Sequence, residues 1–91
     1  MKIKHRGYEI VATKERALGG WQDVYWHACR TRDGYMLFDG FGEYSTPREA
    51  VRWMRRVIDI LIDKFHGRTD RLDDAIDVAA ATAPTHPQPT A

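Results

Sequence analysis

Hydrophobic side chains recur along the chain with two different periods, and the change between them falls near residue 45. From Thr46 to Gly67 they recur at helical spacing, which predicts one amphipathic helix of about twenty residues. Thr46, Pro47 and Glu49 form a capping-box pattern at its start, and Gly67 is suited to a left-handed residue at its end. The predicted apolar stripe comprises Ala50, Val51, Trp53, Met54, Val57, Ile58, Ile60, Leu61, Ile62 and Phe65.

Three stretches before this helix have the β-branched and aromatic composition of strands. Their ranges are 8–14, 24–31 and 35–39. The first stretch has an optional extension back to Ile3 across a bulge at Gly7. Asp33-Gly34 predicts a two-residue hairpin turn between the second and the third. The order is β-β-β-α, so the sequence predicts an α+β fold, a three-stranded antiparallel sheet packed on one long helix.

The remainder of the chain is less strongly patterned. Residues 69–81 have a weak, alanine-rich helical stripe that fits either a short second helix or coil. Residues 82–91 have the Pro, Thr and Ala composition of a disordered tail. The predicted organisation is a βββα domain over 1–67 with a turn at 17–20, the optional short helix within 68–81, and then the tail.

Both faces of the predicted sheet carry aromatic side chains. The two-residue turn places Trp26 and Tyr35 on one face. Tyr25 and Phe38 then share the other face, with Phe38 opposite Cys29. One helix covers only one face, so the second is open to a dimer partner, the C-terminal segment or a ligand. The sequence therefore predicts a non-catalytic protein-binding module, whose partner is another protein or a second copy, with these four aromatic residues as binding candidates.

Charge adds an alternative function. The formal net charge is only +1, so no overall basic signal indicates nucleic acid. Four arginines nevertheless fall on the outer side of the first half of the predicted helix, beside its positive dipole end, and further basic residues lie near the N-terminus. Binding of RNA or DNA is therefore the alternative, and its candidate residues are Lys2, Lys4, Arg6, Arg48, Arg52, Arg55 and Arg56.

Catalytic and metal-binding patterns are not evident in the sequence. His27 and Cys29 are the only close pair of metal-binding types, and zinc requires more ligands than these two supply. Gly40 and Gly42 precede a helix but lack the Gly-Lys-Ser/Thr of a phosphate-binding loop. We therefore predict no catalytic residues, no metal, no cofactor and no enzymatic activity. A single cysteine, no signal-peptide pattern and no membrane-spanning run predict a cytoplasmic protein without a membrane partner.

Two short motifs carry a family resemblance. Gly-Gly-Trp at 19–21 and Gly-Glu-Tyr-Ser-Thr-Pro-Arg-Glu-Ala at 42–50 resemble the HicB antitoxin fold, which implies a βββα unit that binds a toxin protein. The same element order is similar to the double-stranded RNA-binding domain, which implies phosphate contacts from the basic start of the last helix. The whole chain also looks like small single-domain proteins of Burkholderia-like bacteria, and this resemblance implies no activity.

Overall fold

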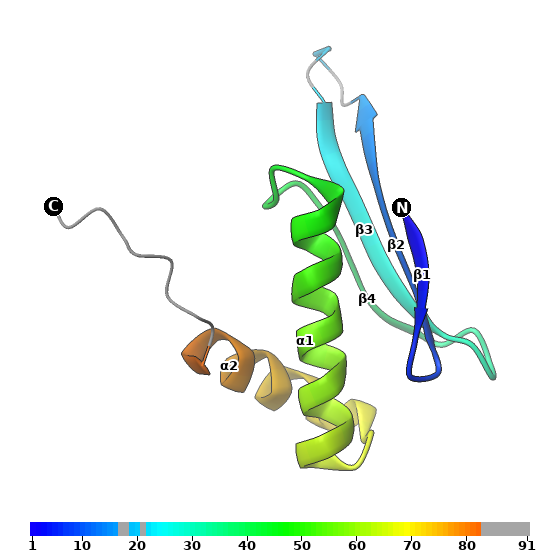
Figure 1. Cartoon of the computed structure of the whole chain (residues 1–91), viewed down its shortest axis with the longest axis vertical. Coiled ribbons are helices and arrows are strands. Elements are labelled where there is room, and N and C mark those ends of the chain that lie inside the picture. The colour runs from blue at the N-terminus through cyan, green and yellow to red at the C-terminus, as the bar shows by residue number, and fades with distance from the viewer. Residues whose placement is uncertain (17–18, 21, 83–91) are drawn as a thin grey trace, which may run out of the picture.

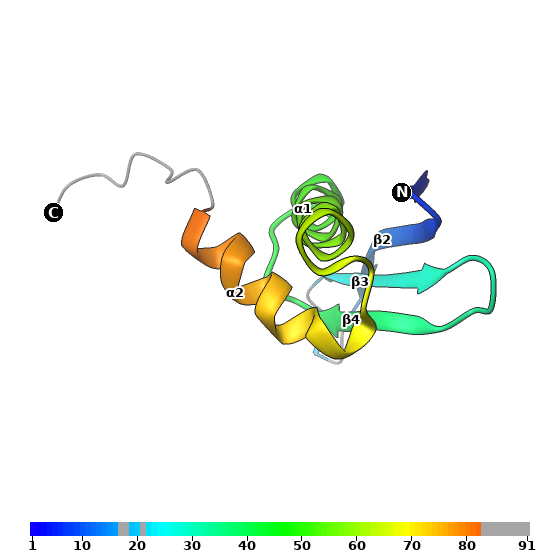
Figure 2. The ribbon, with the colours of Figure 1, turned by 90° about the horizontal axis from the view of Figure 1, so that it is seen from below.

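The computed structural model describes residues 1–16, 19–20 and 22–82. Four antiparallel strands form a sheet in the order β1-β2-β3-β4. The strands are β1 (Lys2–His5), β2 (Tyr8–Arg16), β3 (Gln22–Arg30) and β4 (Met36–Phe41). The helices are α1 (Pro47–Phe65) and α2 (Leu72–Thr82), with a 3-10 helix, Thr69–Arg71, between them. Both α-helices lie on the same side of the sheet (Figure 1 and Figure 2).

The α+β class was predicted correctly, but the prediction of a three-stranded sheet was wrong. Residues 2–16 form a hairpin of two strands, in which His5 pairs with Tyr8. Arg6 and Gly7 have φ angles of 49° and 87°. Positive φ at both central residues is what a two-residue type I′ turn requires. The chain therefore reverses at Gly7, where the sequence predicted a bulge within one strand.

The hairpin between β3 and β4 also differs from the prediction. Residues 31–35 connect the two strands, so the predicted two-residue turn at Asp33-Gly34 was wrong. A bulge at Ala28 and Cys29 then sets Phe38 opposite Ala28 and not opposite Cys29. The extra residue shifts the side-chain alternation of β4 by one position, which moves Phe38 to the other face of the sheet.

Asp33 organises this longer loop. Its carboxylate accepts hydrogen bonds from the Arg30 guanidinium at 2.7 Å and from the Tyr35 backbone N–H at 3.1 Å. These two bonds, that from Arg30 first, lower the pKa of Asp33 to about 2. The Asp33 side chain therefore stabilises this longer loop. Asp33-Gly34 does not form the two-residue turn that the sequence suggested.

The hydrophobic core lies between α1 and the two central strands, β2 and β3. The predicted helical stripe is confirmed, because its buried members face the sheet at helical spacing. These are Ala50, Val51, Met54, Val57, Ile58 and Leu61. Trp26 closes one end of the core, where its indole N–H donates to the Gly42 carbonyl at 3.1 Å. A methyl group on Gly40 would lie only 2.1 Å from the Trp26 ring, so β4 can approach there only with glycine.

The ends of α1 follow the signals in the sequence. Thr46 Oγ1 accepts the Glu49 backbone N–H at 3.2 Å, as the capping box predicted. The Glu49 carboxylate accepts the backbone N–H of Ser45, at 3.1 Å, instead of that of Thr46. At the other end, His66 and Gly67 have left-handed φ angles of 57° and 73°, and these angles stop the helix.

The segment after α1 is helical, which decides between the two alternatives left open by the sequence. α2 packs against α1 and buries Ala75 and Ala79 completely. It therefore covers a flank of α1 and not the free face of the sheet (Figure 2). The predicted tail beyond Thr82, and residues 17–18 of the predicted turn, lie outside the described residues. Neither described helix is long and apolar enough to cross a membrane.

Candidate functional site

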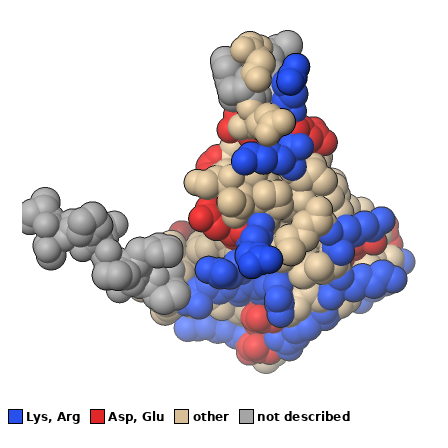
Figure 3. All heavy atoms as spheres, turned by 45° about the horizontal axis from the view of Figure 1, so that its top comes forward, with Lys and Arg blue, Asp and Glu red and all other residues tan. Residues whose placement is uncertain are grey.

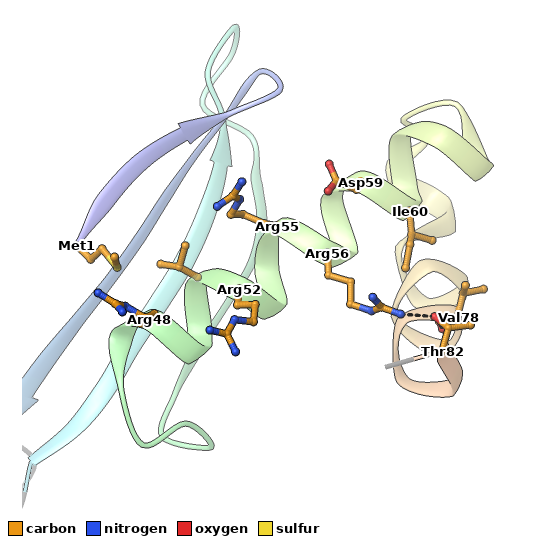
Figure 4. Close-up of a pocket in the computed structure, with 10 residues that line it drawn as sticks. Met1, Arg48, Arg52, Arg55, Arg56, Asp59, Ile60, Val78 and Thr82 are labelled. Atoms are coloured by element: carbon orange, nitrogen blue, oxygen red, sulfur yellow. Dashed lines mark hydrogen bonds between the residues drawn. The ribbon is translucent and has the colours of Figure 1, made fainter. Parts of the chain in front are cut away.

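Four arginines of α1 line an open hollow on the outer side of the helix. The hollow has a volume of about 630 Å³ and is shown in Figure 4. We call these four residues the arginine face; they are Arg48, Arg52, Arg55 and Arg56. The other lining residues are Met1, Val51, Asp59, Ile60, Val78 and Thr82. The guanidinium groups are spread along the helix and do not converge on one point (Figure 4).

The arginine face differs from several other arginines of the protein in its ion pairing. Elsewhere the carboxylate partners are Asp59 and Asp63 for Arg6, Asp33 for Arg30, Asp70 for Arg68 and Asp74 for Arg71. Within the described part of the chain, no carboxylate lies within ion-pair distance of any member of the arginine face. Their charges are therefore free to attract an anion from solution. A space-filling view shows Lys and Arg side chains gathered in a band across the lower half of the visible face (Figure 3).

Arg56 is the most constrained member of the arginine face. Its Nη2 donates to Thr82 Oγ1 at 2.5 Å, and Thr82 Oγ1 in turn donates to the Val78 carbonyl at 2.7 Å. Arg56 Nε is buried and has no hydrogen-bond partner among the described residues. α2 therefore fixes the direction of this side chain and leaves one of its donors unused.

Among the described residues of the lining, Asp59 is the only one with a carboxylate, and the β1–β2 hairpin binds it. His5 Nε2 lies 2.7 Å from Asp59 Oδ1, and Arg6 Nη1 donates to the same oxygen at 3.1 Å. Arg6 also binds Asp63, with a shortest distance of 2.7 Å. The hydrogen bond from Arg6 lowers the pKa of Asp63, and the two carboxylates raise that of Arg6. The Asp59 carboxylate is thus already bound by side chains from the first hairpin of the sheet.

The seven basic residues predicted to bind nucleic acid do not form one surface. The structure brings together the four members of the arginine face. Arg6 lies beside them but is committed to two aspartates. Lys2 and Lys4 pair with Val11 and Glu9 in the β1–β2 ladder, so they point to the sheet face away from the helices. Lys2 and Lys4 are therefore separated from the arginine face by the thickness of the sheet, whereas Arg6 is not.

The four predicted aromatic candidates are divided as well. Trp26 and Phe38 lie on the helix side and contact each other edge to face, with ring centroids 6.1 Å apart. Tyr25 lies on the opposite face, with its ring 5.4 Å from that of His27. Tyr35 is in the exposed 31–35 loop, 5.0 Å from the Arg30 guanidinium. Neither predicted row of aromatic residues remains intact, because the longer loop and the bulge change the register of β4.

The sheet face opposite the helices is covered by no element of the described chain. Directly opposite residues of neighbouring strands share a face, so the strand register defines its members. We call it the open sheet face; it contains Lys2, Lys4, Glu9, Val11, Thr13, Glu15, Asp23, Tyr25, His27, Cys29, Met36, Asp39 and Phe41. The sequence analysis did not identify Val11 and Phe41, because Ile10-Val11-Ala12 is a continuous apolar run whose alternation of burial only the structure shows.

The described residues contain no group of three or more His, Cys, Asp and Glu side chains that could hold a metal ion. Comparisons with known proteins add no identification, since no family model, curated protein or solved structure matches the chain. The resemblances to HicB antitoxins, to double-stranded RNA-binding domains and to proteins of Burkholderia-like bacteria therefore stay predictions. The assignment of function depends on the surfaces of the molecule.

Proposed function

We propose that this protein binds the phosphate backbone of nucleic acids through the arginine face. The observation that carries the proposal is the group of four arginines without carboxylate partners around one hollow. Two binding surfaces were predicted from the sequence. The four arginines predicted for the basic surface on the helix do line one hollow. The predicted aromatic surface, in contrast, loses Trp26 to the core.

The spacing of the arginines supports an extended anion as the ligand. Arg48 and Arg56 are eight residues apart, which is about 12 Å along an α-helix. One strand of a duplex presents a phosphate about every 3.4 Å along its axis, so this span matches three to four phosphates. A compact anion would be held better by guanidinium groups that converge, and these groups do not converge (Figure 4).

The composition of the hollow supports contact with the backbone and not with the bases. Its described uncharged lining residues are Met1, Val51, Ile60, Val78 and Thr82, and none of these is aromatic. Stacking on aromatic side chains is the usual way in which proteins hold unpaired bases. We therefore expect binding without sequence preference, dominated by counterion release.

Salt dependence is the first test. For three to four neutralised phosphates on a duplex, the logarithm of the association constant should fall with the logarithm of salt concentration with a slope of about −3. Fluorescence anisotropy with labelled duplex DNA, duplex RNA and a single strand of equal length measures this slope for each nucleic acid. Absence of binding to all three at low salt would contradict the proposed function.

A matched pair of double variants locates the binding. Arg52→Gln with Arg55→Gln should weaken binding about tenfold or more at low salt and reduce the slope by about two, because two contacts are lost. Arg16→Gln with Arg32→Gln changes the net charge equally at exposed positions away from the hollow, and it should change affinity much less. Equal losses in both double variants would show that total charge, and not the arginine face, drives binding.

The proposed function is a binding function, without catalysis, cofactor or metal. The absence of enzymatic activity and a cytoplasmic location stay predictions from the sequence. A toxin-like protein partner, which the HicB resemblance implies, also stays a prediction.

A further inference from the structure

Arg56 differs from other arginines of the protein in the group that holds its side chain. Within the described chain, the arginines held by an aspartate carboxylate, which also balances their charge, are Arg6, Arg30, Arg68 and Arg71. Arg56 is held instead by a hydroxyl group, because its Nη2 donates to Thr82 Oγ1 at 2.5 Å. A hydroxyl group carries no net charge, so this hydrogen bond orients the guanidinium and leaves its positive charge in place.

Thr82 is itself held in one orientation by the helix to which it belongs. It is the last residue of α2, and its hydroxyl group donates to the Val78 carbonyl, one turn earlier, at 2.7 Å. Because that bond uses the hydroxyl proton, the Thr82 oxygen can only accept from Arg56. α2 in turn packs on α1 through the completely buried Ala75 and Ala79. The direction of the Arg56 side chain therefore depends on the packing of the two helices.

The Arg56 guanidinium keeps hydrogen-bond donors that an anion in the hollow can use. Arg56 and Thr82 both line the hollow, at the end that lies beside α2 (Figure 4). Arg56 Nε is buried without a partner, and the bond to Thr82 uses only one N–H group of Nη2. The remaining N–H groups of Nη1 and Nη2 have no partner within the described chain. Guanidinium N–H groups of this kind bind phosphate oxygens well, because the hydrogen bonds are charge-assisted.

We propose that Thr82 is a positioning residue for the arginine face, and that α2 thereby completes the phosphate site. The inference rests on the proposed nucleic-acid function and names a residue that acts through Arg56. The other three members of the arginine face are exposed and have no side-chain hydrogen bond within the described chain. A side chain that is already ordered loses less freedom on binding, which is worth about two- to tenfold in affinity. Arg56 should therefore contribute more to binding than Arg52 or Arg55.

Fluorescence anisotropy with the same three labelled nucleic acids separates orientation from charge at position 82. Thr82→Val keeps the shape of the side chain without its hydroxyl group. It should weaken binding about two- to tenfold with an unchanged salt slope, because no charge is lost. Thr82→Asp would hold Arg56 by a carboxylate and balance its charge, so it should weaken binding and also reduce the slope by about one. Thr82→Ser restores the hydroxyl group and should restore both the affinity and the slope.

Removal of the guanidinium shows whether Thr82 acts through Arg56. Arg56→Met keeps an apolar stem, and it should reduce the slope by about one and weaken binding more than Arg52→Met does. In the Arg56→Met background, Thr82→Val should have no further effect, since the hydroxyl group then has no guanidinium to hold. The matched control is Thr13→Val, which removes a threonine hydroxyl group from the open sheet face and should leave the affinity unchanged. Circular dichroism should show that every variant is folded.

Two results would overturn the role of Thr82 and leave the proposed function intact. The first is a wild-type chain that binds nucleic acid while Thr82→Val binds equally well. The second is an equal loss from Thr82→Val in the wild-type and Arg56→Met backgrounds, because the hydroxyl group would then act by another route. Absence of binding by the wild-type chain would instead contradict the proposed function, and with it the phosphate site that Thr82 serves.

Discussion

The two halves of α1 carry opposite charges on their outer side, but only the second half is matched by the sheet. In the second half, Asp59 and Asp63 receive hydrogen bonds from Arg6, and Asp59 lies 2.7 Å from His5. In the first half, no described carboxylate lies within ion-pair distance of the arginine face. The difference follows from the reach of the β1–β2 turn, which contacts one half of the helix only. Unmatched charge on a helix is thus a property of the fold around it as well as of its own sequence.

The largest expected effect is a loss of stability, and it concerns the hydrophobic core on which both halves of α1 pack. Met54 is completely buried, so Met54→Ala should lower the free energy of unfolding by about 2–5 kcal/mol through lost burial and a cavity. Urea denaturation of the variant measures this change. Lys64→Ala, at an exposed position of the same helix, is the control and should change stability by less than about 0.5 kcal/mol. Similar values for the two variants would mean that α1 is not held by this core.

The contrast between the two halves can be removed by neutralising the aspartates. Asp59→Asn with Asp63→Asn would release Arg6 and remove the Asp59 charge, the one carboxylate among the described residues that line the hollow. Nucleic-acid affinity at low salt should then rise about three- to tenfold. Anisotropy titrations measure this increase, and Asp73→Asn with Asp77→Asn on exposed positions of α2 gives a control with equal charge change. An unchanged affinity in the first variant would place the binding site away from α1.

The start of the first half depends on a single side-chain cap. Thr46→Ala removes the hydrogen bond to the Glu49 backbone N–H and should cost about 1 kcal/mol of stability. Ser45 offers a control, because only its backbone N–H takes part in the observed cap. Thermal unfolding of Thr46→Ala and Ser45→Ala should therefore differ, and equal melting temperatures would contradict the cap.

The smallest effect concerns the pH dependence of the second half. The hydrogen bond from Arg6 lowers the pKa of Asp63 below its ordinary value, which is about 3.9. Because the folded-state pKa is the lower one, this contribution to stability is present above about pH 4 and is lost as pH falls through the folded-state pKa. NMR titration of the Asp63 carboxyl should show its midpoint rise in Arg6→Gln. Arg30→Gln should leave it unchanged and instead raise the midpoint of Asp33 from about 2.

Local signals in the sequence were sufficient for the helix and its core stripe. Thr46 caps α1 as predicted, and Met54 and Leu61 are buried as their spacing required. The strands were predicted less accurately than the helix, because the residues at which a strand begins and ends depend on the turns that flank it. Arginine seldom adopts a positive φ, so nothing in the sequence indicated the turn at Arg6. The first hairpin was therefore interpreted as one strand. The bulge at Ala28 and Cys29 had no sequence signal, and it changed the face on which Phe38 lies.

By itself, the sequence determined which residues are apolar, where α1 begins and ends, and that four arginines share its outer side. These properties depend on contacts within a few residues, and the regular geometry of a helix makes them readable. Only the tertiary structure decided that Arg6 is committed to Asp59 and Asp63, more than fifty positions away. It also decided that Lys2 lies on the opposite face from the arginines and in one row with Asp39. Turn geometry and strand register set these placements, and one additional residue in a loop or bulge reverses them.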